Sequence, residues 1–187
     1  MSARVATARI GTIVLLSLVA IVLHEAGHFL VYKAAGVPVR ITLQSVRPVG
    51  PVDPTVDFFG KLAGPVASWI LAAFLLWGVH RQGFGWATAA FTNASLRMFP
   101  LVMDLLRAAK GAVPFSDEGD VALTFTGSPA GRFAIVSLAM LVSLILSVLA
   151  ANRYRFTRRA AIQAFGVYAL SLACGIAVVI VDELIHR

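Results

Sequence analysis

The sequence predicts an all-α membrane protein with about five membrane-spanning helices and a small β-hairpin after the first of them. Hydrophobic residues make up 59% of its 187 residues and charged residues only 13%, whereas a soluble domain is about half apolar and roughly a quarter charged. Five apolar segments approach the roughly 20 residues that a helix needs to cross the hydrocarbon core. Helix is expected there because isolated strands would leave backbone groups unpaired in lipid.

The five predicted spans follow one another without a linker that would divide the chain into domains. They cover residues 10–32, 60–79, 84–106, 133–151 and 160–181. The first is interpreted as an uncleaved membrane helix and not as a secretory signal, because its apolar run continues past a polar cluster and no clear cleavage site follows. We therefore expect one membrane domain over residues 1–187, in a multi-pass protein of a bacterial-type cell membrane.

The charged residues indicate contact with lipid headgroups. The net charge is +7, but the Arg and Lys residues lie at the ends of apolar runs and do not form one dense basic face. The lipid bilayer is therefore the expected partner, and nucleic acid is not. The single cysteine, Cys174, supplies neither a disulfide framework nor a cysteine-based metal cluster.

The connection after the first span has the alternating pattern of a β-strand. Apolar residues at Val37, Val39, Ile41 and Leu43 alternate with polar residues or proline, which is the period of two that strands show. The Pro- and Gly-rich stretch over residues 48–54 then predicts a turn before a second strand at residues 55–59. An irregular loop at the membrane surface fits the same pattern, and this alternative stays open.

The segment from His24 to His28 carries the strongest chemical signal in the chain. It reads His-Glu-Ala-Gly-His and fits the pattern H-E-x-x-H. Residues four apart share one face of a helix, so both imidazoles can reach one zinc ion. Glu25, beside the first histidine, can take a proton from the attacking water. Because ionisable groups are costly within an apolar span, they are functional candidates there; the alternative is a polar cluster that only packs helices.

Together with two further segments, this motif resembles the site-2 protease family of intramembrane zinc metalloproteases. The resemblance rests on Leu23-His-Glu-Ala-Gly-His-Phe and Leu62-Ala-Gly-Pro-Val-Ala-Ser, and more loosely on the third span. It covers roughly residues 1–125, the metalloprotease-like core, while residues 126–187 add two membrane helices without diagnostic motifs. In the second segment, Gly64 and Pro65 are expected to allow close helix approach and a local kink.

The chain departs from the family pattern at two places. Ser68 stands where the Gly-Pro helix of the family commonly continues to an asparagine. The family also has an Asn-x-x-Pro segment that leads to an Asp-Gly pair, and here Asn93 and Pro100 are present but no Asp-Gly pair follows. The resemblance implies that Asn93 orients substrate or stabilises an oxyanion, although hydrogen bonding between helices is the commoner use of such a residue.

Two aspartates compete for the third metal position, because catalytic zinc normally takes three protein ligands. Asp117 is preferred: it follows a proline and a serine, as the family aspartate often does, and a helix-breaking stretch precedes it. Asp104 is the alternative, at a depth in the third span comparable to that of His24 in the first. Without a metal role, Asp104 would pair with Arg107 or Lys110, and Asp117 would belong to a solvated acidic loop that caps a short helix.

The sequence therefore predicts an intramembrane zinc metalloendopeptidase whose substrate is a transmembrane protein. Zinc would be held by His24, His28 and Asp117, with Glu25 as the catalytic base. A catalytically inactive relative that binds and regulates membrane partners is the first alternative, since the Asp-Gly pair is missing. A transport or channel protein that uses the buried His and Glu residues is the second alternative. A regulatory membrane partner is a further possible partner of the chain.

Overall fold

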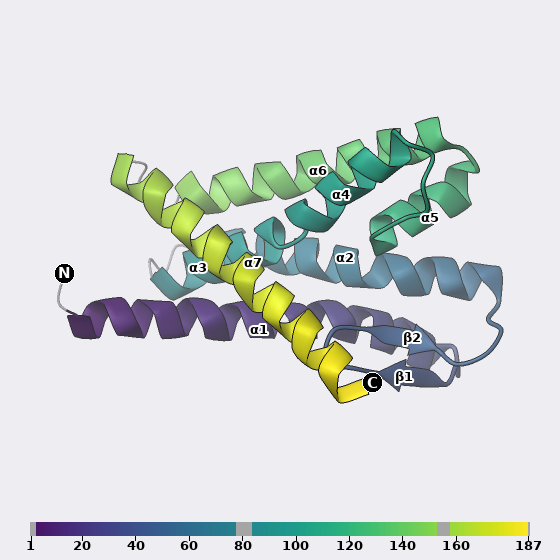
Figure 1. The fold of residues 1–187 in the computed structure, drawn as a ribbon, viewed down its shortest axis with the longest axis horizontal. Helices are drawn as coiled ribbons and strands as arrows, with labels where there is room; N and C mark the ends of the chain where they lie inside the picture. Colours follow the sequence, from purple (N-terminus) through teal and green to yellow (C-terminus); the bar gives the residue numbers. More distant parts are fainter. Residues whose placement is uncertain (1–2, 78–83, 153–157, 187) are drawn as a thin grey trace.

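In the computed structural model, helices, short loops and one two-stranded hairpin make up the described residues, 3–77, 84–152 and 158–186 (Figure 1). The helices are α1 (Ala3–Ala34), α2 (Pro54–Trp77), α3 (Phe84–Ser95), α4 (Met98–Ala108), α5 (Asp117–Thr126), α6 (Pro129–Asn152) and α7 (Arg158–His186). Among these residues, four helices are long and apolar enough to cross a membrane, namely those at α1, α2, α6 and α7. The predicted helical membrane class is confirmed.

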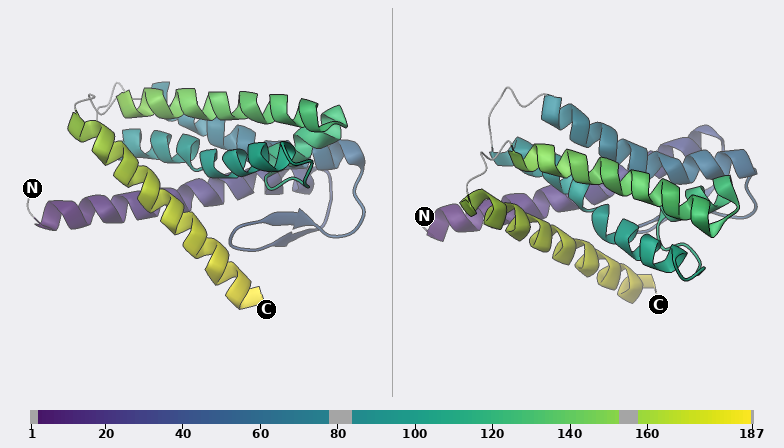
Figure 2. Two further views of the ribbon diagram at one scale, coloured as in Figure 1. Left: turned by 45° about the horizontal axis from the view of Figure 1, so that its top comes forward. Right: turned by 90° about the horizontal axis from the view of Figure 1, so that it is seen from above.

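The long helices run beside and across one another. α1 and α2 lie side by side in opposite directions, α6 packs against α3, α4 and α5, and α7 crosses α1 obliquely (Figures 1 and 2). A buried apolar cluster that includes Ile13, Phe91 and Val167 joins α1, α3 and α7. Large apolar side chains such as Leu30 and Leu138 stay exposed on the outer faces, as contact with lipid tails requires.

A hairpin follows the first helix, as the sequence predicts, but its second strand is not the predicted one. β1 (Val39–Ile41) pairs antiparallel with β2 (Val46–Pro48), with Arg40 opposite Arg47. The turn is 42–45, where Thr42 N–H donates to the Ser45 carbonyl at 2.9 Å. The predicted second strand at residues 55–59 is wrong, because these residues belong to α2.

The start of α2 explains that error. Asp53 accepts a hydrogen bond from Thr55 N–H at 2.9 Å, as a residue that caps a helix does, and Pro54 occupies the first helical position. Proline is favoured there because its missing N–H would have no helical partner in any case. The Pro-rich stretch is therefore the beginning of a helix and not a turn between strands.

The third predicted span, residues 84–106, forms two consecutive helices. α3 ends at Ser95 and α4 begins at Met98. Pro100 has no N–H to donate to the Leu96 carbonyl, and its ring would crowd that carbonyl in a continuous helix. The break leaves Arg97 at the junction, from which its side chain reaches α1.

Candidate metal centre

His24 and His28 lie one turn apart on the buried face of α1. Their side chains are almost fully buried, and their Nε2 atoms are 3.2 Å apart. Gly64 of α2 makes this arrangement possible. A Cβ atom at that position would lie only 2.2 Å from His28 Nε2 and 2.8 Å from His24 Cε1, so the histidines occupy space that only glycine leaves open.

Asp117 completes a triangle with the two histidines. Its Oδ2 atom lies 3.5 Å from His24 Nε2 and 3.4 Å from His28 Nε2. Zinc binds such nitrogen and oxygen atoms at about 2.0–2.1 Å with tetrahedral geometry, and the edge of such a tetrahedron is about 3.3 Å. The three atoms therefore have the mutual spacing that one zinc ion requires, and the preferred third ligand of the sequence prediction lies at this point.

Hydrogen bonds on the far side of each imidazole fix its orientation. His28 Nδ1 lies 2.7 Å from the Gly60 carbonyl oxygen. A carbonyl can only accept, so Nδ1 carries the proton and the lone pair of Nε2 faces Asp117. His24 Nδ1 lies 3.1 Å from Ser68 Oγ. Such outer partners are typical of metal-binding histidines, and Ser68, noted in the sequence as a departure, supplies one of them.

Asp104 lies outside the triangle and supports the loop that carries Asp117. Its carboxylate accepts hydrogen bonds from the N–H groups of Phe115 and Ser116, each at 2.8 Å, and from Ser116 Oγ. Arg132 of α6 pairs with it at 2.5 Å, and both side chains are buried. Arg132, and not the expected Arg107 or Lys110, is therefore the ion-pair partner that the structure gives Asp104.

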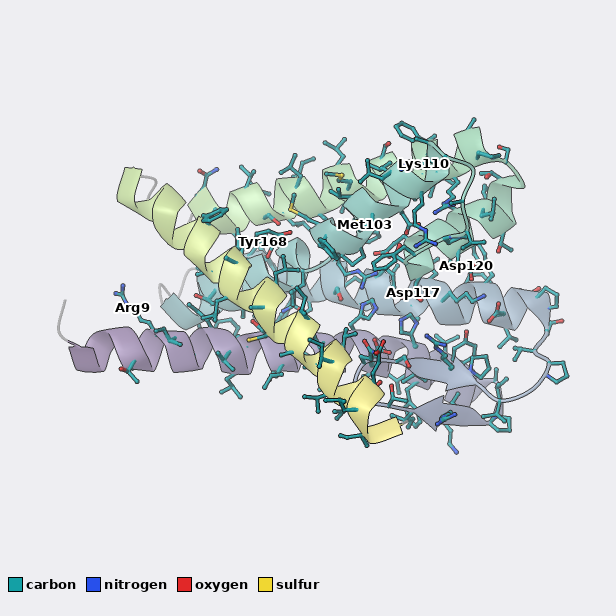
Figure 3. The ribbon with its side chains drawn as sticks, in the orientation of Figure 1. Arg9, Met103, Lys110, Asp117, Asp120 and Tyr168 are labelled. Atoms are coloured by element: carbon teal, nitrogen blue, oxygen red, sulfur yellow. The ribbon has the colours of Figure 1, made fainter. Side chains whose placement is uncertain are left out.

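Asp117 is the first residue of α5, where Ser116 caps the helix by accepting a hydrogen bond from Gly119 N–H. Asp117 and Asp120 lie at this end of α5, next to α2 (Figure 3). Burial alone would raise the pKa of Asp117, but the adjacent side chains of His24 and His28 and the charge of Arg97 hold that pKa well below its usual range. The carboxylate is thus kept in the ionised form that binds a cation.

Glu25 joins the histidines to the hairpin. Ligand atoms of His24, Glu25 and His28 lie within 4.8 Å of one another. Glu25 Oε2 also accepts a hydrogen bond from the N–H of Val46 in β2 at 2.9 Å. This bond orients the carboxylate, so the hairpin helps to position the candidate base.

Asn93 lines the same pocket from α3. It is almost fully buried, and its Nδ2 donates to the Ala89 carbonyl at 2.9 Å within the helix. Its Oδ1 has no hydrogen-bond partner among the described residues. The amide oxygen is therefore a buried acceptor on a residue that lines the pocket.

The pocket beside these residues has a volume of about 340 Å³. His24, Glu25, Asn93, Arg97 and Asp117 supply its polar lining. α7 supplies an apolar wall, with the side chains Leu172, Ile176, Val178 and Val179. Sequence reasoning assigned no role to the last two spans, because a uniformly apolar helix gives no sign of which face meets a site.

Arg97 and Glu118 are the residues that sequence reasoning missed. Arg97 Nη1 lies 3.3 Å from His24 Nε2, and Arg97 makes a two-pronged ion pair with Glu118. The available signal was the position of Arg97 within an apolar run, since an ionisable residue there is a functional candidate. Its partner follows 21 residues later, at a distance that no local pattern predicts.

The arrangement as a whole can hold one divalent cation and present it, with a carboxylate beside it, to a largely apolar pocket. No family model, curated protein or solved structure matches this chain. The chemistry of the site is therefore inferred from its own residues.

Proposed function

We propose that this chain is a zinc metalloendopeptidase that hydrolyses peptide bonds of transmembrane substrates within the bilayer. The triangle of His24 Nε2, His28 Nε2 and Asp117 Oδ2 carries the proposal, because its edges of 3.2, 3.5 and 3.4 Å fit one zinc ion. The second support is the pair of outer partners, Gly60 and Ser68, that hold both imidazoles in place.

In the proposed reaction, zinc and Glu25 would have separate roles. When bound, zinc would polarise the scissile carbonyl and make water more acidic. Glu25 accepts a proton as the water oxygen bonds to the carbonyl carbon. It then delivers this proton to the amide nitrogen as the carbon–nitrogen bond breaks. The products are a carboxylic acid and an amine.

The surroundings of the pocket support a membrane substrate. Four helices long and apolar enough to cross a membrane favour a multi-pass protein, and the α7 wall is apolar. A helical substrate hides its amides in its own hydrogen bonds, so it must unwind near the site. The hairpin, bonded to Glu25 through Val46, offers a strand edge to such an extended segment.

The test compares Glu25→Gln with the wild type for zinc content and for cleavage of a panel of labelled single-span peptides in liposomes. We expect zinc to stay bound and the cleavage rate to fall by at least about 100-fold, because a general base contributes roughly 10²–10⁴-fold. Glu183→Gln, an exposed glutamate at the end of α7, is the matched control and should cleave normally.

Two results would contradict the enzyme assignment in different ways. If the purified wild-type protein does not hold stoichiometric zinc, the proposed metal site itself is refuted. If the wild type binds zinc but cleaves none of the peptides, and Glu25→Gln gives the same result, the inactive regulatory alternative is favoured instead.

A further inference from the structure

Arg97 places a permanent positive charge directly beside the proposed zinc ligands. It lies at the break between α3 and α4, and only 13% of its side chain is exposed. Its Nη1 atom is 3.3 Å from His24 Nε2, and its Nη2 atom is 3.9 Å from Asp117 Oδ2. A guanidinium stays protonated at any physiological pH, so this cation is a fixed part of the pocket.

Glu118 holds the guanidinium in one orientation. Arg97 Nε donates to Glu118 Oε1 at 2.8 Å, and Nη2 donates to Glu118 Oε2. Glu118 is only 3% exposed, so this two-pronged pair is shielded from water and geometrically defined. Nε and Nη2 are engaged by the glutamate, while Nη1 lies beside His24 Nε2 and Arg97 lines the pocket.

Zinc binding would change what Nη1 can bond to. The lone pair of His24 Nε2, which Nη1 now approaches, would be used by the ion. A buried N–H group without an acceptor is costly, so Nη1 needs a new one. Arg97 lines the pocket beside the histidines, and in the proposed reaction the oxygen of a scissile carbonyl would be the acceptor available there.

The charges of the named groups stay balanced through the proposed step. Zinc and Arg97 bring three positive charges, and Glu25, Asp117 and Glu118 bring three negative charges. When Glu25 takes the proton of the attacking water, one negative charge is lost from the protein. The carbonyl oxygen gains one negative charge in the same step, which restores the balance beside Arg97.

We propose that Arg97 is a further catalytic residue, which donates from Nη1 to the oxygen that becomes negative in the tetrahedral intermediate, and that Glu118 is its positioning residue. The inference rests on the proposed function, since it assumes a hydrolysed carbonyl at this site. It also gives a role to Glu118, whose carboxylate orients the guanidinium.

A binding experiment tests this without knowledge of the natural substrate. Cobalt(II) replaces zinc in purified protein, and visible absorption follows the binding of phenylphosphinate, a tetrahedral monoanion that mimics the intermediate. Imidazole, a neutral ligand, is the control probe. Arg97→Gln should weaken phenylphosphinate binding about 10- to 100-fold, as expected for one charge-assisted hydrogen bond, and change imidazole binding less than about twofold.

Arg97→Lys keeps the charge but loses the fork of donors, so its phenylphosphinate affinity should lie between those of the wild type and Arg97→Gln. If Arg97→Gln does not accumulate, the phenylphosphinate affinity of Arg97→Lys is the measurement that tests the role of Arg97. Wild-type affinity for phenylphosphinate in either cobalt-loaded variant would overturn the role of Arg97 and leave the proposed protease intact. Failure of the wild type to bind cobalt or zinc would instead overturn the proposed function.

Discussion

Replacing Gly64 by alanine should strongly impair zinc binding, because the new methyl group would occupy the place of a metal ligand. The added Cβ would lie 2.2 Å from His28 Nε2 and 2.6 Å from His28 Cε1. An ordinary non-bonded contact is roughly 3.5 Å, so the imidazole must retreat by about 1.3 Å. Zinc sites tolerate about 0.2 Å in their ligand distances.

We therefore expect the zinc affinity of Gly64→Ala to fall by at least about 100-fold, the upper end of the losses seen when only an outer partner of a ligand is changed. Competition with a chelator of known affinity, in detergent, measures this loss. Gly11→Ala is the matched control: it also adds a methyl group to a long apolar helix, but nothing lies within 4 Å of that Cβ.

Wild-type zinc affinity in Gly64→Ala, with helix content unchanged by circular dichroism, would refute this reasoning. It would mean that the histidines bind zinc in positions other than those found against α2. An equal loss in Gly11→Ala would also refute it, because the effect would then come from helix substitution in general.

Two further predictions concern contacts that support the site. Asp104→Ala leaves Arg132 buried without its carboxylate partner, so the free energy of unfolding should fall by about 3–5 kcal/mol. Denaturation in mixed micelles measures this loss. The control is Asp120→Ala, at a part-exposed ion pair, which should lower the free energy of unfolding by less than about 1 kcal/mol. Asp182→Ala removes the acceptor of Leu43 N–H, now at 2.8 Å, so hydrogen exchange at Leu43 should become faster; unchanged exchange would show that α7 does not restrain the hairpin.

The sequence predicted most of what depends on local pattern. Apolar length predicted the long helices, and the four-residue spacing of His24 and His28 predicted that their side chains share one face. Alternation from Val37 to Leu43 predicted a strand after the first helix. The second strand was misplaced, because Asp53 and Pro54 are common both in turns and at helix starts, and only the following backbone bonds distinguish the two.

The contacts that complete the site depend on the packing of distant segments. Arg97 reaches Glu118 only because Pro100 interrupts what the sequence presented as one span. Arg132, on α6, forms the ion pair with Asp104 that the sequence assigned to Arg107 or Lys110. Neither pairing has a periodic signature, since each joins two elements whose relative placement is set by the whole helix assembly.

Zinc K-edge X-ray absorption of the purified protein tests the central claim most directly. We predict one zinc per chain, two imidazole nitrogens and oxygen ligands at about 2.0–2.2 Å, with no sulfur, and loss of this signal in His28→Ala and Asp117→Ala. Protein that holds no zinc, or that keeps an unchanged zinc spectrum in both variants, would contradict the account.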